Sequence, residues 1–384
     1  MDIQLIDQAD ALPEVEQDLA TARRIALDCE AAGFHRYSDR VCLIQLTSGQ
    51  RTYLLDPLAL SLDELLRPFL EDPDREVIMH GADFDLRLLD RDLDIQLKGL
   101  FDTQVAASVL GIDGIGLQSL LDRTLGVELA KKYQRADWAR RPLPEPMLRY
   151  AALDTVHLMK LADQLTQELE EAGRMSWAME ENRALETIRH EDSSGDDPAA
   201  RLKAARGLSD REVHRLREGL AWRDELARRR DKAPFRVTND SVLLEVARQN
   251  PSSVRELANI QGMNGALARD EGEALLDRLR QVDALPDQEV VGLPIPDRAG
   301  SGRPPPEVEE RMRTLKGIRN RKAGELGIDR GTLLPNALLE VLAADPPVEL
   351  TQMARVSGIR QWQVKVVGPE LMDVLAREMT GSGS

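Results

Sequence analysis

An internal duplication restricts what the C-terminal half of this sequence can fold into. Residues 237–263 align without a gap to the segment 96 residues further along, 333–359, and Gly262 falls on Gly358. Because turn and core positions both match, the two segments are expected to fold alike. Two copies are too few for a solenoid, and a copy of about 75 residues is long enough to fold by itself. The duplication therefore predicts two small all-α domains in tandem.

Two stretches of biased composition divide the chain of 384 residues into three parts. The stretch 190–200 is acidic and rich in small residues, and the stretch 284–306 is rich in proline and glycine without sustained periodicity. Such composition is typical of linkers. The predicted order is an N-terminal domain at 1–189, a linker at 190–207, a helical domain at 208–283, a Pro/Gly-rich linker at 284–306, a second helical domain at 307–379 and a tail at 380–384.

The N-terminal part alternates strand and helix patterns. Short apolar runs at 24–31, 41–47 and 52–56 are typical of strands, and the short links between them favour antiparallel hairpins. Further patterns predict a helix at 62–70, a strand at 76–80, a helix from Asp83 and a last helix over 147–165, after the proline-rich RPLPEP. This order indicates an α/β domain, a mixed sheet with flanking helices.

Composition excludes several classes of protein. No apolar run approaches the ~18 residues of a membrane helix, so we expect no membrane partner. The start of the chain lacks a basic region leading into an apolar stretch, so a cytoplasmic location is expected. The two cysteines, Cys29 and Cys42, form no CxxC or Cys/His cluster, which excludes a disulfide framework and a zinc site. Any metal is therefore expected to have oxygen ligands.

Charge is distributed unevenly along the chain. The net charge is -16, yet the windows 131–141, 201–232 and 311–330 carry +4, +5 and +5. Such windows favour phosphate contacts, although solvated helix faces would give the same pattern. Five residues of the first window are the candidates for contact with nucleic-acid phosphates: Lys131, Lys132, Arg135, Arg140 and Arg141. The windows in the helical domains predict a role in capturing a nucleic acid.

Carboxylates recur at positions suited to one site. Asp28 and Glu30 alternate on a predicted strand, so both lie on one face, where a divalent cation would relieve their repulsion. Asp85 follows another strand, in the kind of strand-to-helix region where sites of α/β domains gather. Alternatively, it only adds a favourable charge to the first turn of the helix. Tyr150 and Asp154 are neighbours on one helical face. Alternatively, Tyr150 is a core-edge aromatic residue and Asp154 a surface acid.

At these residues the sequence resembles the ribonuclease D family, within the tyrosine subgroup of the DEDD exonuclease superfamily. The first motif, with Asp28 and Glu30, precedes VCLIQL; the second, with His80 and Asp85, precedes FDTQ; Tyr150 follows YQRADWARRPL. The histidine subgroup has its general base five residues before the last aspartate, where this chain has Arg149. The tandem helical domains resemble helicase-and-ribonuclease-D C-terminal (HRDC) domains.

The resemblance implies an RNase H-like fold and 3′-to-5′ trimming of RNA, with tRNA precursors as the kind of substrate. It also implies two divalent metal ions, Mg²⁺ or Mn²⁺, which suit an all-carboxylate site. By this resemblance Asp28 bridges both ions, Glu30 and Asp154 ligate the ion that activates water, and Asp85 helps to hold the other. Tyr150 orients the water, because a phenol with a pKa of about 10 is a poor base at neutral pH. The expected partner is RNA with a free 3′ end, and a monomer is favoured.

Two other functions stay open at this point. The chain could be a nucleic-acid-binding scaffold that uses its tandem helical domains and has little catalytic activity, or it could be a DNA 3′-5′ exonuclease. We expect structural roles for His35, His80 and His157. Cys29 lies between two proposed ligands, but alternation along the strand directs it to the opposite face, into the core.

Overall fold

The computed structural model describes residues 2–128, 132–191, 195, 197–294 and 305–381. Its N-terminal domain is built on one six-stranded sheet with strand order β1-β4-β3-β2-β5-β6. The strands are β1 (Asp2–Ile6), β2 (Arg24–Ala31), β3 (Val41–Ser48), β4 (Arg51–Leu55), β5 (Glu76–Met79) and β6 (Leu100–Asp102). Strands β2, β3 and β4 pair antiparallel, whereas β1, β5 and β6 join them in parallel pairs. The predicted mixed sheet is thus confirmed.

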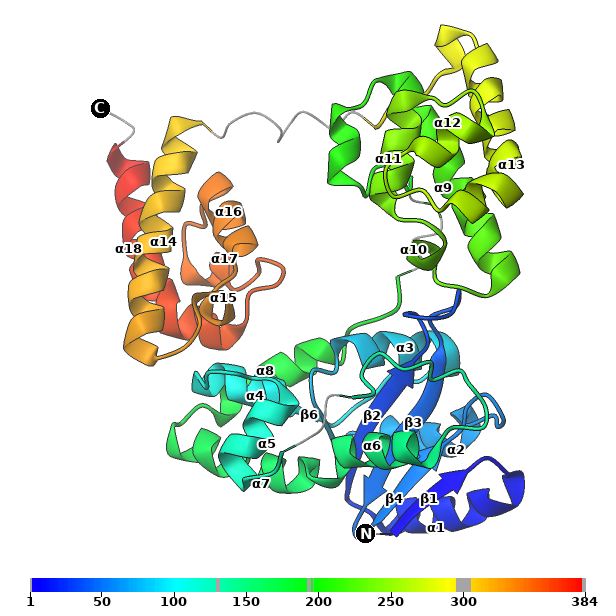
Figure 1. Ribbon diagram of the computed structural model, residues 1–384. Coiled ribbons are helices and arrows are strands. Elements are labelled where there is room, and N and C mark those ends of the chain that lie inside the picture. Colours follow the sequence, from blue (N-terminus) through cyan, green and yellow to red (C-terminus); the bar gives the residue numbers. More distant parts are fainter. Residues whose placement is uncertain (1, 129–131, 192–194, 196, 295–304, 382–384) are drawn as a thin grey trace.

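Helices cover both faces of this sheet (Figure 1). Those of the N-terminal domain are α1 (Leu12–Thr21), α2 (Asp63–Leu70), α3 (Asp83–Leu93), α4 (Thr103–Leu110), α5 (Leu117–Leu125), α6 (Glu145–Val156), α7 (Leu158–Glu171) and α8 (Met175–Leu185). Alternate residues of β2 enter two separate cores. Ile25, Leu27 and Cys29 pack with α1, α2 and α3, whereas Ala26 packs with α4 and α7. Leu43 of β3 packs with α6 on the same side as Ala26.

Several elements of this domain were not predicted from the sequence: α1, α4, α5, α8, β6 and the edge strand β1, which pairs with β4. The single helix expected over 147–165 is two helices, because the chain turns at His157, between α6 and α7. The turn lets α6 pack on β2, β3 and β4 while α7 packs on β2 and β5.

The duplicated half forms two helical domains of matching construction. The first helical domain comprises α9 (Asp210–Arg230), α10 (Pro234–Val237), α11 (Asp240–Gln249), α12 (Val254–Asn259) and α13 (Gly265–Ala284). The second comprises α14 (Pro306–Leu326), α15 (Arg330–Leu333), α16 (Asn336–Ala344), α17 (Leu350–Met353) and α18 (Gln361–Gly381). Each helix of the second domain begins 96 residues after its counterpart. Gly262 and Gly358 have φ values of +87° and +89°, so one left-handed turn recurs in both copies.

The segment before the first helical domain is packed rather than free. Ala199 and Ala205 are buried in the core of that domain, and the short 3-10 helix η2 (Lys203–Gly207) lies directly before α9. The sequence placed these residues in the linker 190–207. Small side chains signalled a flexible segment, but here their size lets the backbone lie close against the helices.

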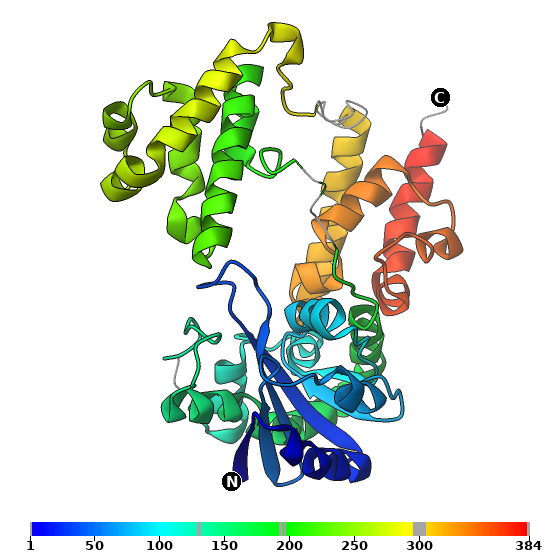
Figure 2. The same ribbon diagram turned by 90° about the vertical axis from the view of Figure 1, so that its right-hand side faces the viewer.

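Both helical domains contact the N-terminal domain (Figures 1 and 2). The second domain rests on α8, where Arg360 pairs with Glu181 at 3.1 Å. The first domain meets the loop between β2 and β3, where the Tyr37 hydroxyl donates to Asp224 at 3.0 Å. Arg36 of that loop pairs with Asp231 of the first helical domain at 3.1 Å and with Asp137 of the N-terminal domain at 2.8 Å. No helix among the described residues is long and apolar enough to span a bilayer.

Candidate active site

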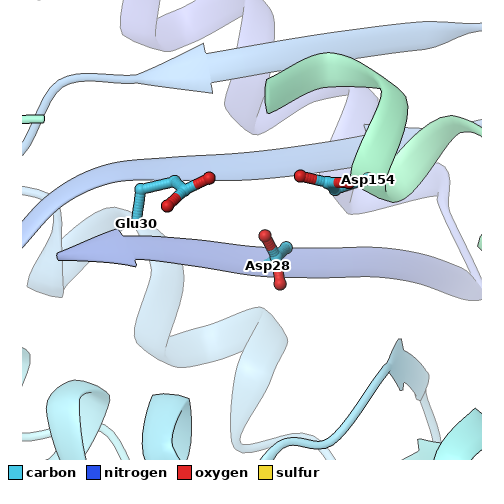
Figure 3. A group of neighbouring side chains, drawn as sticks. All are labelled: Asp28, Glu30 and Asp154. Atoms are coloured by element: carbon cyan, nitrogen blue, oxygen red, sulfur yellow. The ribbon is translucent and has the colours of Figure 1, made fainter. Parts of the chain in front are cut away.

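Three carboxylates predicted to share a site converge in the structure. Asp28 and Glu30 lie on the face of β2 that also carries Ala26, toward α6 and α7, and Asp154 extends from α6. Their ligand atoms all lie within 4.8 Å of one another. In Figure 3 the carboxyl groups of Glu30 and Asp154 point toward each other above the strand, and Asp28 rises between them. The spacing would let one small cation contact all three.

Local structure explains why Asp154 faces the strand. Helix α6 begins after Pro144 and carries Pro146 in its first turn, where proline favours helix initiation. The hydroxyl of Thr155 bonds that of Thr47 at 2.8 Å, which fixes the end of α6 on β3. Directly after Glu30 the pairing of β2 with β3 shifts by one residue. Such bulges re-aim side chains next to active sites.

Asp85 reaches the site from a different element. It lies in the first turn of α3, after β5, and is buried with 8% of its surface exposed. It is not one of the three clustered carboxylates, yet its negative charge contributes to raising the pKa of Asp28 and of Glu30. The predicted quartet therefore divides into a close group of three and a fourth carboxylate nearby.

Burial and mutual repulsion make the ionised form of the four carboxyl groups unfavourable and so raise their pKa values. Burial, followed by the charges of Asp85, Asp154 and Glu30, raises the pKa of Asp28 well above its ordinary value. Burial and the charges of Asp154 and Asp85 raise the pKa of Glu30 to about 9. Burial raises the pKa of Asp154 to about 7, and burial with the charge of Asp102 raises that of Asp85 to about 8. A divalent cation would remove this cost by compensating the carboxylates. The all-oxygen donor set fits a hard cation such as Mg²⁺ or Mn²⁺.

Tyr150 lies one helical turn before Asp154 and faces the same cleft. Its ring meets that of Tyr133 edge to face, with ring centroids 5.7 Å apart, and lies 6.3 Å from that of buried Trp138. Burial and the charges of Asp154, Glu30 and Asp28 raise the pKa of the phenol well above 10. Tyr150 is therefore a neutral hydrogen-bonding group at ordinary pH, held in place by two aromatic neighbours.

The three histidines that invited a catalytic role have different surroundings. His80 lines the cleft, its Nδ1 bonds the Thr103 hydroxyl at 2.9 Å, and burial lowers its pKa. His35 bonds the backbone carbonyl of Arg135 through Nε2 at 2.8 Å. His157 occupies the turn between α6 and α7. Hydrogen bonds account for His80 and His35, and the turn between two helices accounts for His157, so we assign none of the three a catalytic role.

The cleft contains residues that the sequence did not identify. It has a volume of about 610 Å³. Besides the predicted residues it is lined by Gly116, Leu117, Gln118, Ser119, Asp122, Glu128 and Gln134. Most belong to the start of α5 and the segment after it, which have no chemical motif to reveal them. Gln45 was also missed: it pairs with Asp28 across β2 and β3, is fully buried, and its amide bonds no described residue.

The five RNA-binding candidates have separate outcomes. Lys131 lies outside the described residues. Lys132 is exposed over the Tyr133 ring, and Arg140 is exposed. Arg135 lies over the Phe34 ring, 5.5 Å from its centre. Arg141 is instead bound within the fold: it contacts Asp56 at 2.5 and 2.7 Å and three backbone carbonyls at 2.6 to 2.9 Å. Its donors are used, so we no longer count it among the RNA contacts.

Comparison with known proteins agrees with this architecture. A model for a 3′-5′ exonuclease domain matches residues 3–170, and a model for the HRDC domain matches 213–279 and again 308–375. The fold and the acidic cleft thus define a 3′-5′ exonuclease with two HRDC domains. A ribonuclease D of Pseudomonas paraeruginosa is 30% identical over 97% of this chain and 98% of its own length. The chain therefore belongs to the ribonuclease D family of 3′-5′ exoribonucleases.

Solved structures extend the likeness across all three domains. The crystal structure of Escherichia coli RNase D, described as an exoribonuclease involved in structured RNA processing, superposes with a TM-score of 0.72. It is 26% identical, and the match covers 98% of this chain and 99% of that one. A protein from Bifidobacterium adolescentis superposes with a TM-score of 0.81 at 25% identity, covering 97% of this chain and 99% of that one.

Proposed function

We propose that this chain removes nucleotides from the 3′ end of RNA by hydrolysis at a site where Asp28, Glu30, Asp85 and Asp154 hold two divalent cations. The observation that carries the proposal is the convergence of three carboxylates, with ligand atoms within 4.8 Å of one another, in a cleft that raises the pKa of each. An unneutralised cluster of this kind is costly, whereas divalent cations would stabilise it.

Each carboxylate has a distinct proposed role. Asp28, at the centre of the cluster, would contact both ions; Glu30 and Asp154 would share one of them, and Asp85 would help to hold the other. Bound divalent cations supply charge compensation for the scissile phosphate and lower the pKa of an attacking water. Gln134 and the start of α5 form the other wall of the cleft, and we assign to them the orientation of the terminal nucleotide.

Tyr150 is the proposed residue that orients the attacking water. The raised pKa of its phenol speaks against proton abstraction, because the hydroxyl stays protonated over the whole working range. A neutral phenol can still donate and accept a hydrogen bond. The edge-to-face contact with Tyr133 limits the motion of the ring. Positioning is therefore the role that fits this group.

We propose tRNA precursors, and similar RNAs with a free 3′ end, as substrates, with the chain acting as a monomer. The description of the Escherichia coli enzyme as one involved in structured RNA processing supports this class of substrate. The basic residues Lys132, Arg135 and Arg140 near the cleft are the proposed phosphate contacts. Because discrimination of RNA from DNA depends on the 2′-hydroxyl, paired substrates of one sequence test it directly.

Digestion of single-stranded RNA labelled at its 5′ end tests the proposal. We expect a ladder of products shortened one nucleotide at a time in the presence of Mg²⁺, and none in EDTA. Asp28→Asn and Asp154→Asn should each abolish the ladder. Asp163→Asn is the matched control and should leave the ladder intact, because Asp163 is an exposed carboxylate of α7 that pairs with Arg24 of β2. Absence of any product from the unmodified protein would support the scaffold function instead, and equal digestion of DNA would contradict specificity for RNA.

A further inference from the structure

An exposed aromatic pair lies where the N-terminal domain meets the first helical domain. Phe34, in the loop between β2 and β3, and Phe235, in α10, have ring centroids 5.4 Å apart. Their exposed fractions are 40% and 46%, although the chain has only five phenylalanines. Hydrogen bonds of the adjoining residues already hold the two domains together. Contact between two exposed rings is therefore not needed to join the domains.

Three basic residues surround this pair. Arg236 lies 4.7 Å from the centre of the Phe34 ring, and Arg135 lies 5.5 Å from it. Lys232 shares with Arg236 and His35 a hollow of about 310 Å³, which Arg36, Asp137, Arg230 and Asp231 also line. Most arginines of the described chain pair with carboxylates, but Arg135, Arg236 and Lys232 pair with no carboxylate of the described residues. We call Phe34, Phe235, Arg135, Arg236 and Lys232 the junction cluster.

The backbone ties the junction cluster to residues of the cleft at two places. Gln134 lines the cleft, and the next residue, Arg135, belongs to the cluster. Phe34 follows Glu30 by four residues, and a chain of that length spans at most about 14 Å. That distance equals about four stacked nucleotides at about 3.4 Å each. The cluster is therefore within reach of the last few nucleotides of an RNA whose 3′ end occupies the cleft.

We infer that the junction cluster is a stacking site for single-stranded RNA, assembled only when the first helical domain is docked. Bases stack on the parts of the Phe34 and Phe235 rings that stay exposed beside Arg236 and Arg135, and these two arginines and Lys232 contact the phosphates on either side. This chemistry suits RNA of any sequence, because every base has a π-face and arginine adds a cation–π contribution. The inference rests on the proposed function for the direction of the RNA strand, whose 3′ end enters the cleft.

Docking explains why both domains are needed. The Ala233 amide donates to the His35 carbonyl at 3.2 Å, and the Arg236 guanidinium donates to the Phe34 carbonyl at 2.6 Å. These contacts hold α10 against the loop, so Phe235 lies beside Phe34. Arg36 is occupied by Asp137 and Asp231, so it is not a phosphate contact. No lysine or arginine is among the described residues that line the acidic cleft, and the cluster provides cationic groups close to it.

Binding of octameric RNA in EDTA, where no hydrolysis occurs, tests the site independently of catalysis. A set of octamers, each with one abasic position, is titrated against the full-length protein. In the unmodified protein, an abasic position within about four nucleotides of the 3′ end should weaken binding about 5- to 150-fold, the range expected for one stacked base. The Phe34→Leu/Phe235→Leu variant should bind the intact octamer more weakly by the same factor and lose its dependence on the abasic position. The single variant Phe34→Trp, which keeps an aromatic ring at position 34, should keep the dependence on the abasic position.

The charged members have their own test. Arg135→Gln/Arg236→Gln should reduce the slope of log affinity against log salt concentration by about 1.4, at about 0.7 per phosphate in single strands. Arg269→Gln, at an exposed arginine of α13, and Met179→Ala, as exposed as Phe235, are the controls for charge and for apolar surface.

Two results would overturn the inference. One is an abasic profile that is the same in the unmodified protein and in the Phe34→Leu/Phe235→Leu variant. The other is an equal loss of affinity at every position, which would make the two phenylalanines only a joint between domains. Failure of the proposed function would look different: intact RNA would not be shortened in Mg²⁺, while the abasic profile would persist in EDTA.

Discussion

Trp177 of α8 and Trp362 of α18 stack face to face, with ring centroids 4.6 Å apart and planes inclined by 14°. The indole nitrogen of Trp362 also donates to Glu181 at 2.8 Å. Trp177 packs against the core of the N-terminal domain and against that of the second helical domain. The N-terminal domain and the second helical domain therefore share apolar contacts and pack against each other.

Removal of the second helical domain by truncation at Leu285 is expected to lower the melting temperature while leaving short RNA cleavable. The truncation exposes Trp177 and removes the donors to Glu180 and Glu181. The five proposed site residues all precede the cut. Thermal unfolding and digestion of a short unstructured RNA measure the two effects. An unchanged melting temperature would contradict the shared packing.

A point substitution separates this contact from the rest of the domain. Trp362 is 3% exposed, so Trp362→Ala should destabilise the protein by about 3–5 kcal/mol, the usual cost of such a truncation. Trp362→Phe keeps a ring for stacking and loses only the donor to Glu181, and we expect it to lose less than half as much. Equal losses would show that the hydrogen bond, not the stacked ring, is the main contribution.

The metal-free protein should lose stability as the pH rises from 6 to 9. The pKa of Asp154 is raised to about 7, that of Asp85 to about 8 and that of Glu30 to about 9, so the folded chain holds these protons more tightly than the unfolded chain. Their contribution is complete below about pH 4 and is lost as the pH rises through those values. Thermal unfolding in EDTA measures the trend.

Millimolar Mg²⁺ should cancel this loss, because a cation replaces the protons. Asp28→Asn should make the metal-free protein more stable at pH 8 and should weaken its stabilisation by Mg²⁺. Asp163→Asn is the control and should behave like the unmodified protein. A melting temperature in EDTA that rises between pH 6 and 9 would contradict the assignment of the cluster.

Tyr150→Phe should slow hydrolysis with little change in RNA affinity, because it removes only the hydroxyl and keeps the ring against Tyr133. The loss should stay within the ~10²–10⁴-fold range of a positioned acid–base group. The pH dependence of the remaining activity should keep its shape, since the raised pKa of the phenol places its titration above the working range. An equal loss in affinity would make Tyr150 a substrate contact.

Gly111→Ala should disturb the docking of the second helical domain. Gly111, at the end of α4, has φ +77°, and a Cβ atom there would lie 1.7 Å from the carbonyl oxygen of Gly327. Both the left-handed backbone and the close approach therefore exclude a side chain. Gly126→Ala is the matched control, because Gly126 has a similar φ of +63° but a Cβ atom there would meet no atom within 4 Å. A melting temperature equal in the two variants would place the cost in the backbone alone.

Motif spacing predicted the site better than it predicted the surroundings of the site. Alternation on a strand places Asp28 and Glu30 on one face, and helical spacing places Asp154 beside Tyr150; both are local properties, and the resemblance to the family joins them into one site. Gln45 and Gln134 approach the cleft through strand pairing and through the course of a loop, which no local pattern encodes.

The same limit explains the errors in the fold. The break at His157 depends on tertiary packing, in which α6 reaches β3 and β4 and α7 reaches β5, so the continuous apolar pattern across it concealed the turn. Arg141 looked like a surface cation because the sequence does not show its partner Asp56, 85 residues earlier in the chain. The helical duplication was predictable in full, since it is a comparison of the sequence with itself.

Arg36 has a consequence for building chimaeras from this family. Its one guanidinium pairs with Asp137, in the segment that also carries Tyr133, and with Asp231, in the first helical domain. A donor domain transplanted from a relative must therefore bring a carboxylate at the place of Asp231. Without it, a graft that folds well by itself would leave Arg36 paired only with Asp137, and the loop would keep only its other contacts, such as that of Tyr37 with Asp224. Compatibility between recipient and graft can thus be screened first at the positions of Asp224 and Asp231, before any gene is assembled.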